Sequence, residues 1–259
     1  MRDWNVFVLY LIMVGYGYLI EFIIYILLGS YQYYPKIMPK QPYFDSNLGA
    51  IASNFLSLPV SAVMIAMYRL GWGTIALCVL LFAGIEWLFV ELGIYRHNWW
   101  HIGYTSLGLP TYYLIAKCWS RWLKNPLKGF RKAVLLFFII GTITSNFQVL
   151  GFMILQTRSY HVGWFADPAH DTTAFAAVYY LSVSLFFTLV LMLRNTYPKI
   201  KFILAMAFVL SVSLTLKHIG IIKVHVWWDL PFMLVACSLA LWLSGLAAAR
   251  LSRERHAWR

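Results

Sequence analysis

The chain has few charged residues. Only 12% of its 259 residues are Asp, Glu, Lys or Arg, and only nine are acidic. Soluble domains carry about 25% charged residues. Hydrophobic residues make up 61% of the chain and aromatic residues 18%. This composition argues against an ordinary soluble domain and indicates a membrane protein, whose aromatic rings suit the two membrane interfaces.

Acidic residues are too few to balance the basic ones, so the formal net charge is +12. Such an excess can indicate nucleic-acid binding in a soluble protein. Here the basic residues lie in short segments between long apolar runs, which is typical of membrane topology signals. We therefore predict membrane lipid, and no nucleic acid, as a partner; the sequence identifies no protein partner.

Cysteine and the common catalytic motifs are also scarce. The three cysteines (Cys78, Cys118 and Cys237) form no CxxC pair, so no disulfide framework or zinc finger is predicted. The chain has no Walker A loop, dinucleotide fingerprint or GxSxG elbow, and we predict no cofactor. The first apolar run, about 25 residues long, lacks a signal-peptide cleavage site and is predicted to be a retained anchor.

Long apolar runs are abundant. A bilayer core needs about 20 apolar residues per helix. On that basis we predict an all-α, polytopic transmembrane helix bundle that forms a single integral membrane domain over residues 1–259. The eight expected spans cover residues 4–29, 47–70, 71–95, 99–119, 133–156, 172–193, 201–222 and 225–248. The fourth is the weakest, because it contains His101, Pro110 and Lys117.

The basic segments predict the orientation of the bundle. Residues 120–132, residues 194–201 and the tail 250–259 are rich in Lys and Arg and are expected in the cytoplasm. Both termini are then cytoplasmic, and the protein is expected in the plasma membrane. The outer loops 30–46 and 157–171, rich in Pro and aromatic residues, could act as short lids. A four-plus-four arrangement of spans invites a repeat hypothesis, but no residue-level match supports it.

Four carboxylates fall inside the apolar segments: Glu21, Glu86, Glu91 and Asp229. Charges at the bilayer centre cost roughly 2.5–3.5 kcal/mol and usually face a bundle interior or a cavity. All four lie in the outer half of the predicted bundle, so we expect one acidic pocket that opens outward. We predict that Glu86 and Asp229 are its catalytic acid pair.

Further polar and aromatic residues fall at similar depths. The predicted binding residues are Glu21, Glu91, Tyr95, His101, Asn146, Gln148, His218, His225 and Trp228. A purely structural role is an open alternative, because a buried carboxyl group that becomes protonated can simply hydrogen-bond to a neighbouring helix. A metal site is weighed as well, since His97 and His101 share a helical face. The chain lacks the several histidine clusters of membrane di-iron enzymes, and no metal is predicted.

One stretch resembles a known family. Tyr34-Pro35, Pro39, Pro59-Val60, Glu86, then Gly93-Ile94-Tyr95, Trp99 and Tyr104 are similar to a motif in small, uncharacterised multi-pass membrane proteins of spore-forming Gram-positive bacteria. The similarity covers about residues 31–122. It implies a bacterial plasma membrane and assigns no activity. Glu86 stands at the family's membrane glutamate, whereas Glu91 replaces an expected aromatic residue.

Three functions stay open at this stage. Membrane terpene cyclases are helical bundles of similar size with acids on an early and a late span, so Glu86 and Asp229 could perform acid–base chemistry on a prenyl or other lipid substrate. Their Asn-x-x-Trp-Glu motif is absent here. The alternatives are a non-catalytic sensor or assembly component of the envelope or of sporulation, and a small-solute or proton-coupled transporter.

Overall fold

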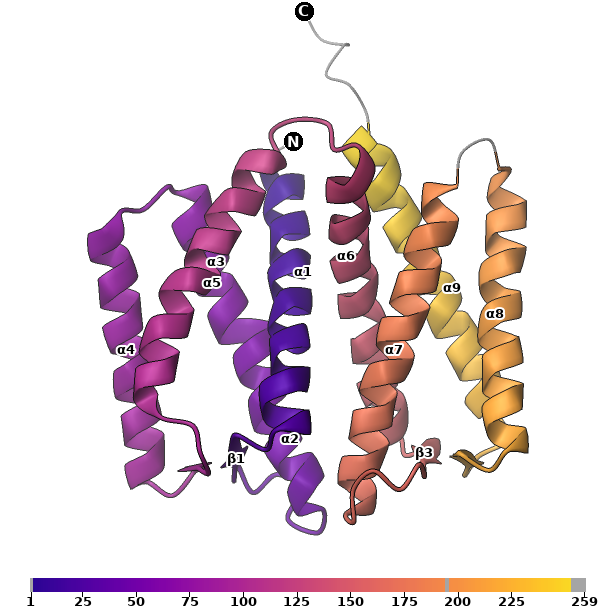
Figure 1. Cartoon of the computed structure of the whole chain (residues 1–259), viewed down its shortest axis with the longest axis horizontal. Coiled ribbons are helices and arrows are strands. Elements are labelled where there is room, and N and C mark those ends of the chain that lie inside the picture. Colours follow the sequence, from indigo (N-terminus) through magenta and orange to yellow (C-terminus); the bar gives the residue numbers. More distant parts are fainter. Residues whose placement is uncertain (1, 194–195, 253–259) are drawn as a thin grey trace, which may run out of the picture. The chain divides into compact units, whose positions relative to one another are not determined.

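The structure is a computed structural model that describes residues 2–193 and 196–252. Arg194 and the tail beyond residue 252, both used in the predicted orientation, lie outside these residues. The described chain is mostly helical and contains eight long helical segments, when each π-helical turn is counted with the α-helix that it continues (Figure 1). The predicted helix bundle is confirmed at this level.

Where the sequence predicts one domain, contacts divide the chain into two compact units, Met1–Asn125 and Pro126–Arg259. The division falls within the basic loop 120–132. Each unit contains four of the long helical segments and one pair of strands.

The first unit begins with one long helix that ends in a π-helical turn. Its second helix is also interrupted by a π-helical turn, and two further helices follow. The elements in chain order are α1 (Arg2–Glu21), η1 (Phe22–Leu27), β1 (Tyr31–Tyr33), α2 (Pro42–Ala52), η2 (Ser53–Ser57), α3 (Leu58–Met67), α4 (Trp72–Glu91), β2 (Tyr95–His97) and α5 (Ile102–Trp122).

The second unit follows the same order without a break in its second helix. Its elements are α6 (Gly129–Val149), η3 (Leu150–Ile154), β3 (Arg158–Tyr160), α7 (Pro168–Met192), α8 (Pro198–His218), β4 (Ile222–Val224) and α9 (Asp229–Ser252). A buried apolar cluster that includes Leu136, Val183 and Phe187 forms its core.

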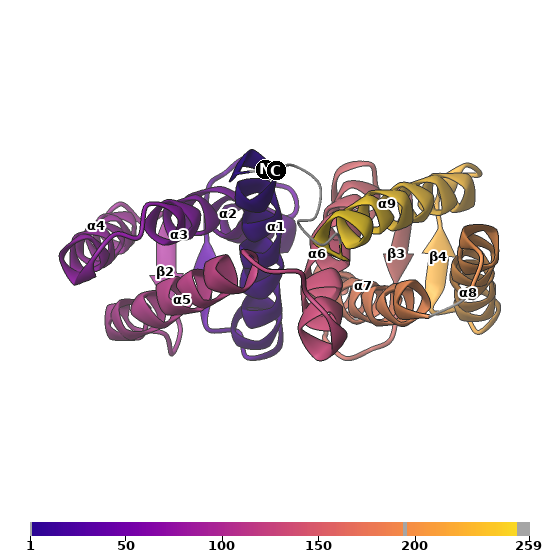
Figure 2. The ribbon, with the colours of Figure 1, turned by 90° about the horizontal axis from the view of Figure 1, so that it is seen from above.

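Each unit also has one pair of short strands, which the sequence did not predict. β1 pairs antiparallel with β2, and β3 pairs antiparallel with β4. Predicted spans 71–95 and 201–222 ran into these strands. The helices end earlier, at Glu91 and His218, because Gly93 and Gly220 adopt positive φ angles of 66° and 80° that end a helix. Seen from above, each strand pair lies within the outline of its own unit's helices (Figure 2).

Seven helices are long and apolar enough to cross a membrane. They cover Trp4–Leu27, Pro42–Met67, Trp72–Glu91, Gly129–Ile154, Pro168–Met192, Pro198–His218 and Asp229–Ala249. The helix α5 is also 21 residues long but is not among them, so a count of eight spans stays a prediction. α4 exposes Leu77, Leu80 and Leu81, an apolar face that suits contact with lipid.

Candidate functional site

The two units repeat one framework around their strands. Tyr31–Tyr33 and Tyr95–His97 in the first unit correspond to Arg158–Tyr160 and Ile222–Val224 in the second, each 127 positions later, and the strand registers agree. The residues that precede the first strand, Gly29 and Gln156, both have positive φ. The repeat that the sequence suggested only as a pattern of spans is therefore present in the backbone.

An aspartate organises the loop after the first strand in both units. The Asp45 carboxylate accepts the backbone N–H groups of Lys36, Ile37 and Met38 at 2.7–2.9 Å. Asp171 accepts four backbone N–H groups, from residues 162 to 165, at 2.8–3.4 Å. Sequence reasoning missed both acids and treated the loops as lids.

The next residue along each chain segment strengthens the match. Ser46 Oγ accepts the N–H of Tyr33 at 2.9 Å, and Thr172 Oγ1 accepts the N–H of Tyr160 at 3.2 Å. A Tyr followed about a dozen positions later by Asp-Ser or Asp-Thr at a helix start is the sequence signal that could have found these loops.

The first unit contains a cavity of about 660 Å³ below its strands, that is, on the side of the strands that faces the helix bundle. All four helical segments and both strands of that unit line it, mostly with apolar and aromatic side chains. Two of the four carboxylates singled out from the sequence, Glu21 and Glu86, lie in its wall. Ligand pockets typically measure about 300–1,000 Å³, so this cavity has the size of a small-molecule site.

Glu21 is the more buried of the two acids, with 8% of its surface exposed. The Tyr31 hydroxyl donates a 2.6 Å hydrogen bond to its carboxylate. Burial, and next the charge of Glu21, raise the pKa of Tyr31 well above its ordinary value. Tyr31 is therefore a neutral donor, and it holds one oxygen of Glu21 in place at the cavity wall.

Glu86 is bonded to a histidine. His97 Nε2 lies 2.8 Å from Glu86 Oε1, a distance at which the ring N–H donates to the carboxylate. Glu86 belongs to α4 and His97 to β2, so the pairing of β2 with β1 positions the imidazole ring against the Glu86 side chain. The side chains of His97 and Glu86 retain 19% and 10% exposure, and of the two only Glu86 is among the described residues that line the cavity.

Aromatic side chains surround these acids. The rings of Tyr31 and Tyr33 contact Tyr95 with centroid distances of 5.1 and 4.6 Å, and Trp100 contacts Tyr104 at 5.4 Å. Burial raises the pKa of Tyr33 and of Tyr95 above the ordinary value, so both hydroxyls stay protonated. Tyr95, predicted as a binding residue, is part of the cavity wall.

The corresponding region of the second unit is filled. Its cavity measures only about 10 Å³, with Gln148, Tyr179 and Tyr180 among the lining residues. Gln148 stands at the position of Glu21 and accepts the Tyr160 hydroxyl at 3.1 Å. Tyr179 and Tyr180 lie 126 positions after Ser53 and Asn54, the interval that also separates Asp45 from Asp171, so two bulky rings stand where the first unit has smaller side chains.

Asp229, the second predicted catalytic acid, lies in this second unit and is 1% exposed. Arg158 donates to its two carboxylate oxygens through Nε and Nη2 at 2.8 Å each, and Thr157 Oγ1 donates at 2.7 Å. Burial alone would lower the pKa of Arg158, but Tyr160 and Asp229 raise it above the ordinary value. Asp229 is not among the described residues that line the cavity of Glu86. Its bonds to Arg158 are those of a structural ion pair.

The remaining predicted residues lie elsewhere. Glu91, His101 and His218 are exposed. Asn146 donates to the carbonyl of Thr142 in its own helix. Exposed His225 and Ser159 are hydrogen-bonded at 3.0 Å, and the ring of Trp228 contacts Phe232. Within the part of the chain that the structure describes, no group of three or more His, Cys, Asp or Glu residues is placed to hold a metal ion.

No protein-family model, curated protein or solved structure matches the chain. The resemblance over residues 31–122 therefore stays a prediction, and the candidate site depends on geometry alone.

Proposed function

We propose that the protein is a multi-pass membrane protein that binds a lipid-like molecule in the cavity of its first unit. The molecule would place its apolar part against the aromatic wall and its polar group near Glu21 and Glu86. Because basic residues gather in the loop 120–132, we expect the strand ends of the helices to face outward. The bacterial plasma membrane implied by the resemblance is the proposed location.

One observation carries this proposal: the same framework occurs twice, and among the described residues the first unit has a cavity of about 660 Å³ with two carboxylates in its wall, where the corresponding region of the second unit measures about 10 Å³. The second unit shows that the framework folds with this space filled. The fold therefore does not require the open space in the first unit. Carboxyl groups in an apolar bundle cost free energy, and ligand binding explains why the first unit keeps two of them around this space.

Acid–base chemistry is the finer part of the proposal. Glu86 lines the cavity and is hydrogen-bonded to His97, so the Glu86 carboxyl group can exchange a proton with a ligand while His97 holds it in place. Aromatic faces nearby would stabilise a cationic intermediate of a prenyl substrate. Asp229 has no part in this version, because Arg158 holds both of its oxygens.

The test uses two glycines of the same helix, α5. A Cβ added at Gly108 or at Gly103 meets nothing within 4 Å, and only Gly108 lines the cavity. Gly108→Leu should therefore fill cavity space, whereas Gly103→Leu should not. The measurement is saturable retention of geranylgeraniol, a prenyl alcohol, by the full chain in phosphatidylcholine nanodiscs.

We expect Gly108→Leu to weaken retention at least about tenfold, which corresponds to about 1.4 kcal/mol. Gly103→Leu should bind like the original protein. Equal binding by the two variants, or no saturable binding of geranylgeraniol or of oleic acid to the original chain, would overturn the proposal.

A further inference from the structure

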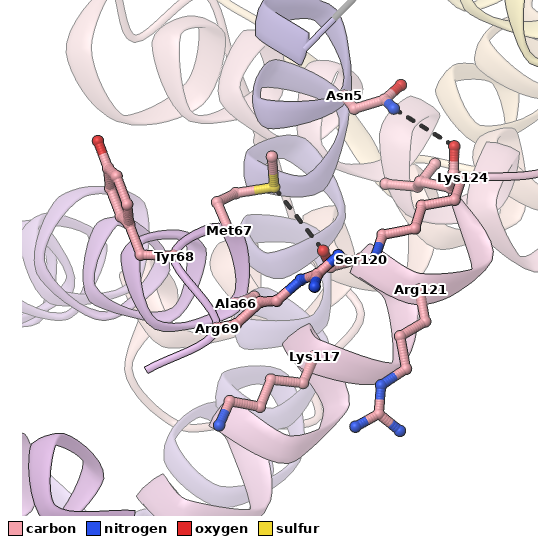
Figure 3. A pocket seen from close by; sticks show the side chains of 10 residues that line it. Asn5, Ala66, Met67, Tyr68, Arg69, Lys117, Ser120, Arg121 and Lys124 are labelled. Carbon is pink, nitrogen blue, oxygen red and sulfur yellow. Dashed lines mark hydrogen bonds between the residues drawn. The ribbon is translucent and has the colours of Figure 1, made fainter. Parts of the chain in front are cut away.

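A second, larger pocket of about 890 Å³ lies in the first unit (Figure 3), at the helix ends opposite to the strands (Figure 1). It is formed where the turn between α3 and α4 faces the last turns of α5 and the start of α1. Its lining residues are Asn5, Ala66, Met67, Tyr68, Arg69, Lys117, Ser120, Arg121, Leu123 and Lys124.

The pocket is strongly basic. Four of the ten described residues that line it are Arg or Lys, and none of the ten is acidic. Arg69 and Arg121 are exposed and come from different elements, the α3–α4 turn and α5. Asn5 and Ser120 bring neutral polar groups to the same wall. This combination suits an anion with several oxygen atoms, because guanidinium groups donate paired hydrogen bonds to phosphate.

The turn that carries Arg69 has an unusual backbone. Arg69 has a φ of 54°, a left-handed conformation that favours glycine at the end of a helix. The hydrogen bond from Leu70 N to Ile65 O closes this turn, and Lys117 Nζ donates to the carbonyl oxygen of Leu70. A non-glycine residue in this conformation costs on the order of 1 kcal/mol, and such strain concentrates at ligand sites. Arginine here therefore points to a role for its side chain.

The pocket also lies at a membrane boundary. The apolar helical segments Pro42–Met67 and Trp72–Glu91 end and begin on either side of the Arg69 turn. Phosphate groups of lipids concentrate at this depth, and basic pockets between helices bind lipid headgroups there.

We propose that this pocket binds a phosphate group, with Arg69 and Arg121 as its principal ligands. The site is separate from the cavity below the strands and does not depend on the function proposed for that cavity. The phosphate could belong to an anionic phospholipid or to a soluble molecule, and the experiment distinguishes the two.

The full chain would be prepared in nanodiscs of phosphatidylcholine alone and of phosphatidylcholine with phosphatidylglycerol. Native mass spectrometry would count retained phosphatidylglycerol, and titration calorimetry in the first nanodisc would measure binding of inorganic phosphate. The variants are Arg69→Gly and Arg121→Gln, with Lys199→Gln as the control that removes an exposed positive charge outside the pocket.

We expect each pocket variant to weaken binding about tenfold or more, and the control to leave it unchanged. Arg69→Gly should keep or raise the melting temperature, because glycine relieves the strained φ; a loss of binding is then not a loss of folding. Retention of phosphatidylglycerol alone identifies a lipid headgroup, whereas binding of inorganic phosphate identifies a site for soluble phosphate as well. The proposal is wrong if neither probe binds, or if the pocket variants behave like Lys199→Gln.

Discussion

The two units share their backbone framework and differ in what lies beneath the strands. In the first unit small or slender residues, among them Gly17 and Ser53, leave a cavity with Glu21 in its wall. In the second, Thr144 lies 127 positions after Gly17, Tyr179 lies 126 positions after Ser53, the interval that also separates Asp45 from Asp171, and the space is filled. The comparison indicates that side-chain volume at a few positions, and not the arrangement of strands and loops, separates an open site from a packed core.

Helix packing also differs between the two units, and again the first unit is the more loosely packed. α9 packs mainly against α6 and α8, while α5 packs mainly against α3 and α4. The first helix and the last helix therefore lie in closer contact in the second unit than in the first. Residues of both α1 and α5 line the cavity of the first unit, so the looser contact accompanies the open space.

The largest expected effect concerns the buried ion pair of Arg158 and Asp229 in the second unit. Arg158→Ala would leave the Asp229 carboxylate buried without its cation, at a cost of about 3–5 kcal/mol. Thermal unfolding of the full chain in detergent, followed by circular dichroism, would measure the loss. The paired variant Arg158→Tyr/Asp229→Ile, which places in the second unit the residues found at positions 31 and 102, should recover most of the stability.

Recovery by the paired variant would strengthen the equivalence of the two units. If the double change is as damaging as Arg158→Ala alone, the second unit needs its ion pair for more than charge balance, and the two frameworks are less alike than their strand registers indicate.

A smaller effect, and an equal one in both units, is expected for the loop aspartates. Asp45→Asn and Asp171→Asn each replace a charged acceptor of several backbone N–H groups by an amide oxygen that accepts fewer of them. We expect each variant to lose about 2 kcal/mol of stability. Hydrogen exchange of residues 36–38 and 162–165, measured by mass spectrometry, would locate the loss. A loss in only one of the two loops would contradict the shared framework.

The helices were predictable because a membrane span is recognised from the mean hydropathy of about 20 residues, on which any single residue has little influence. The strands were not, since three-residue pairs such as Tyr31–Tyr33 with Tyr95–His97 depend on partners far along the chain. The sequence also placed the end of the span 71–95 too late. Positive φ at Gly93 ends the helix, although hydropathy alone would extend it through this apolar run.

The sequence identified Glu21 and Glu86 as costly acids, and both line the cavity. It could not assign partners. Arg158 falls in the segment 157–171, which was expected to be an outer loop, but it is 2% exposed and bonded to Asp229. Glu86 and Asp229 were paired because of their predicted depth in the membrane. They fold into different units, and depth gives no information on which helices pack together.

The smallest expected effect on stability separates a structural role of Glu21 from a functional one. The second unit has Gln148 at this position, and its amide oxygen accepts a tyrosine hydroxyl as the Glu21 carboxylate does. Glu21→Gln should therefore fold with a loss of less than about 1 kcal/mol, because the Tyr31 hydroxyl still has an acceptor. If Glu21 recognises the polar group of a ligand, the same variant should bind geranylgeraniol several times more weakly in the nanodisc assay, with Gln148→Glu as the converse change in the packed unit. A Glu21→Gln protein that keeps both its stability and its binding would show that the carboxylate does no more than Gln148 does, and Glu86 with His97 would be left as the polar part of the site.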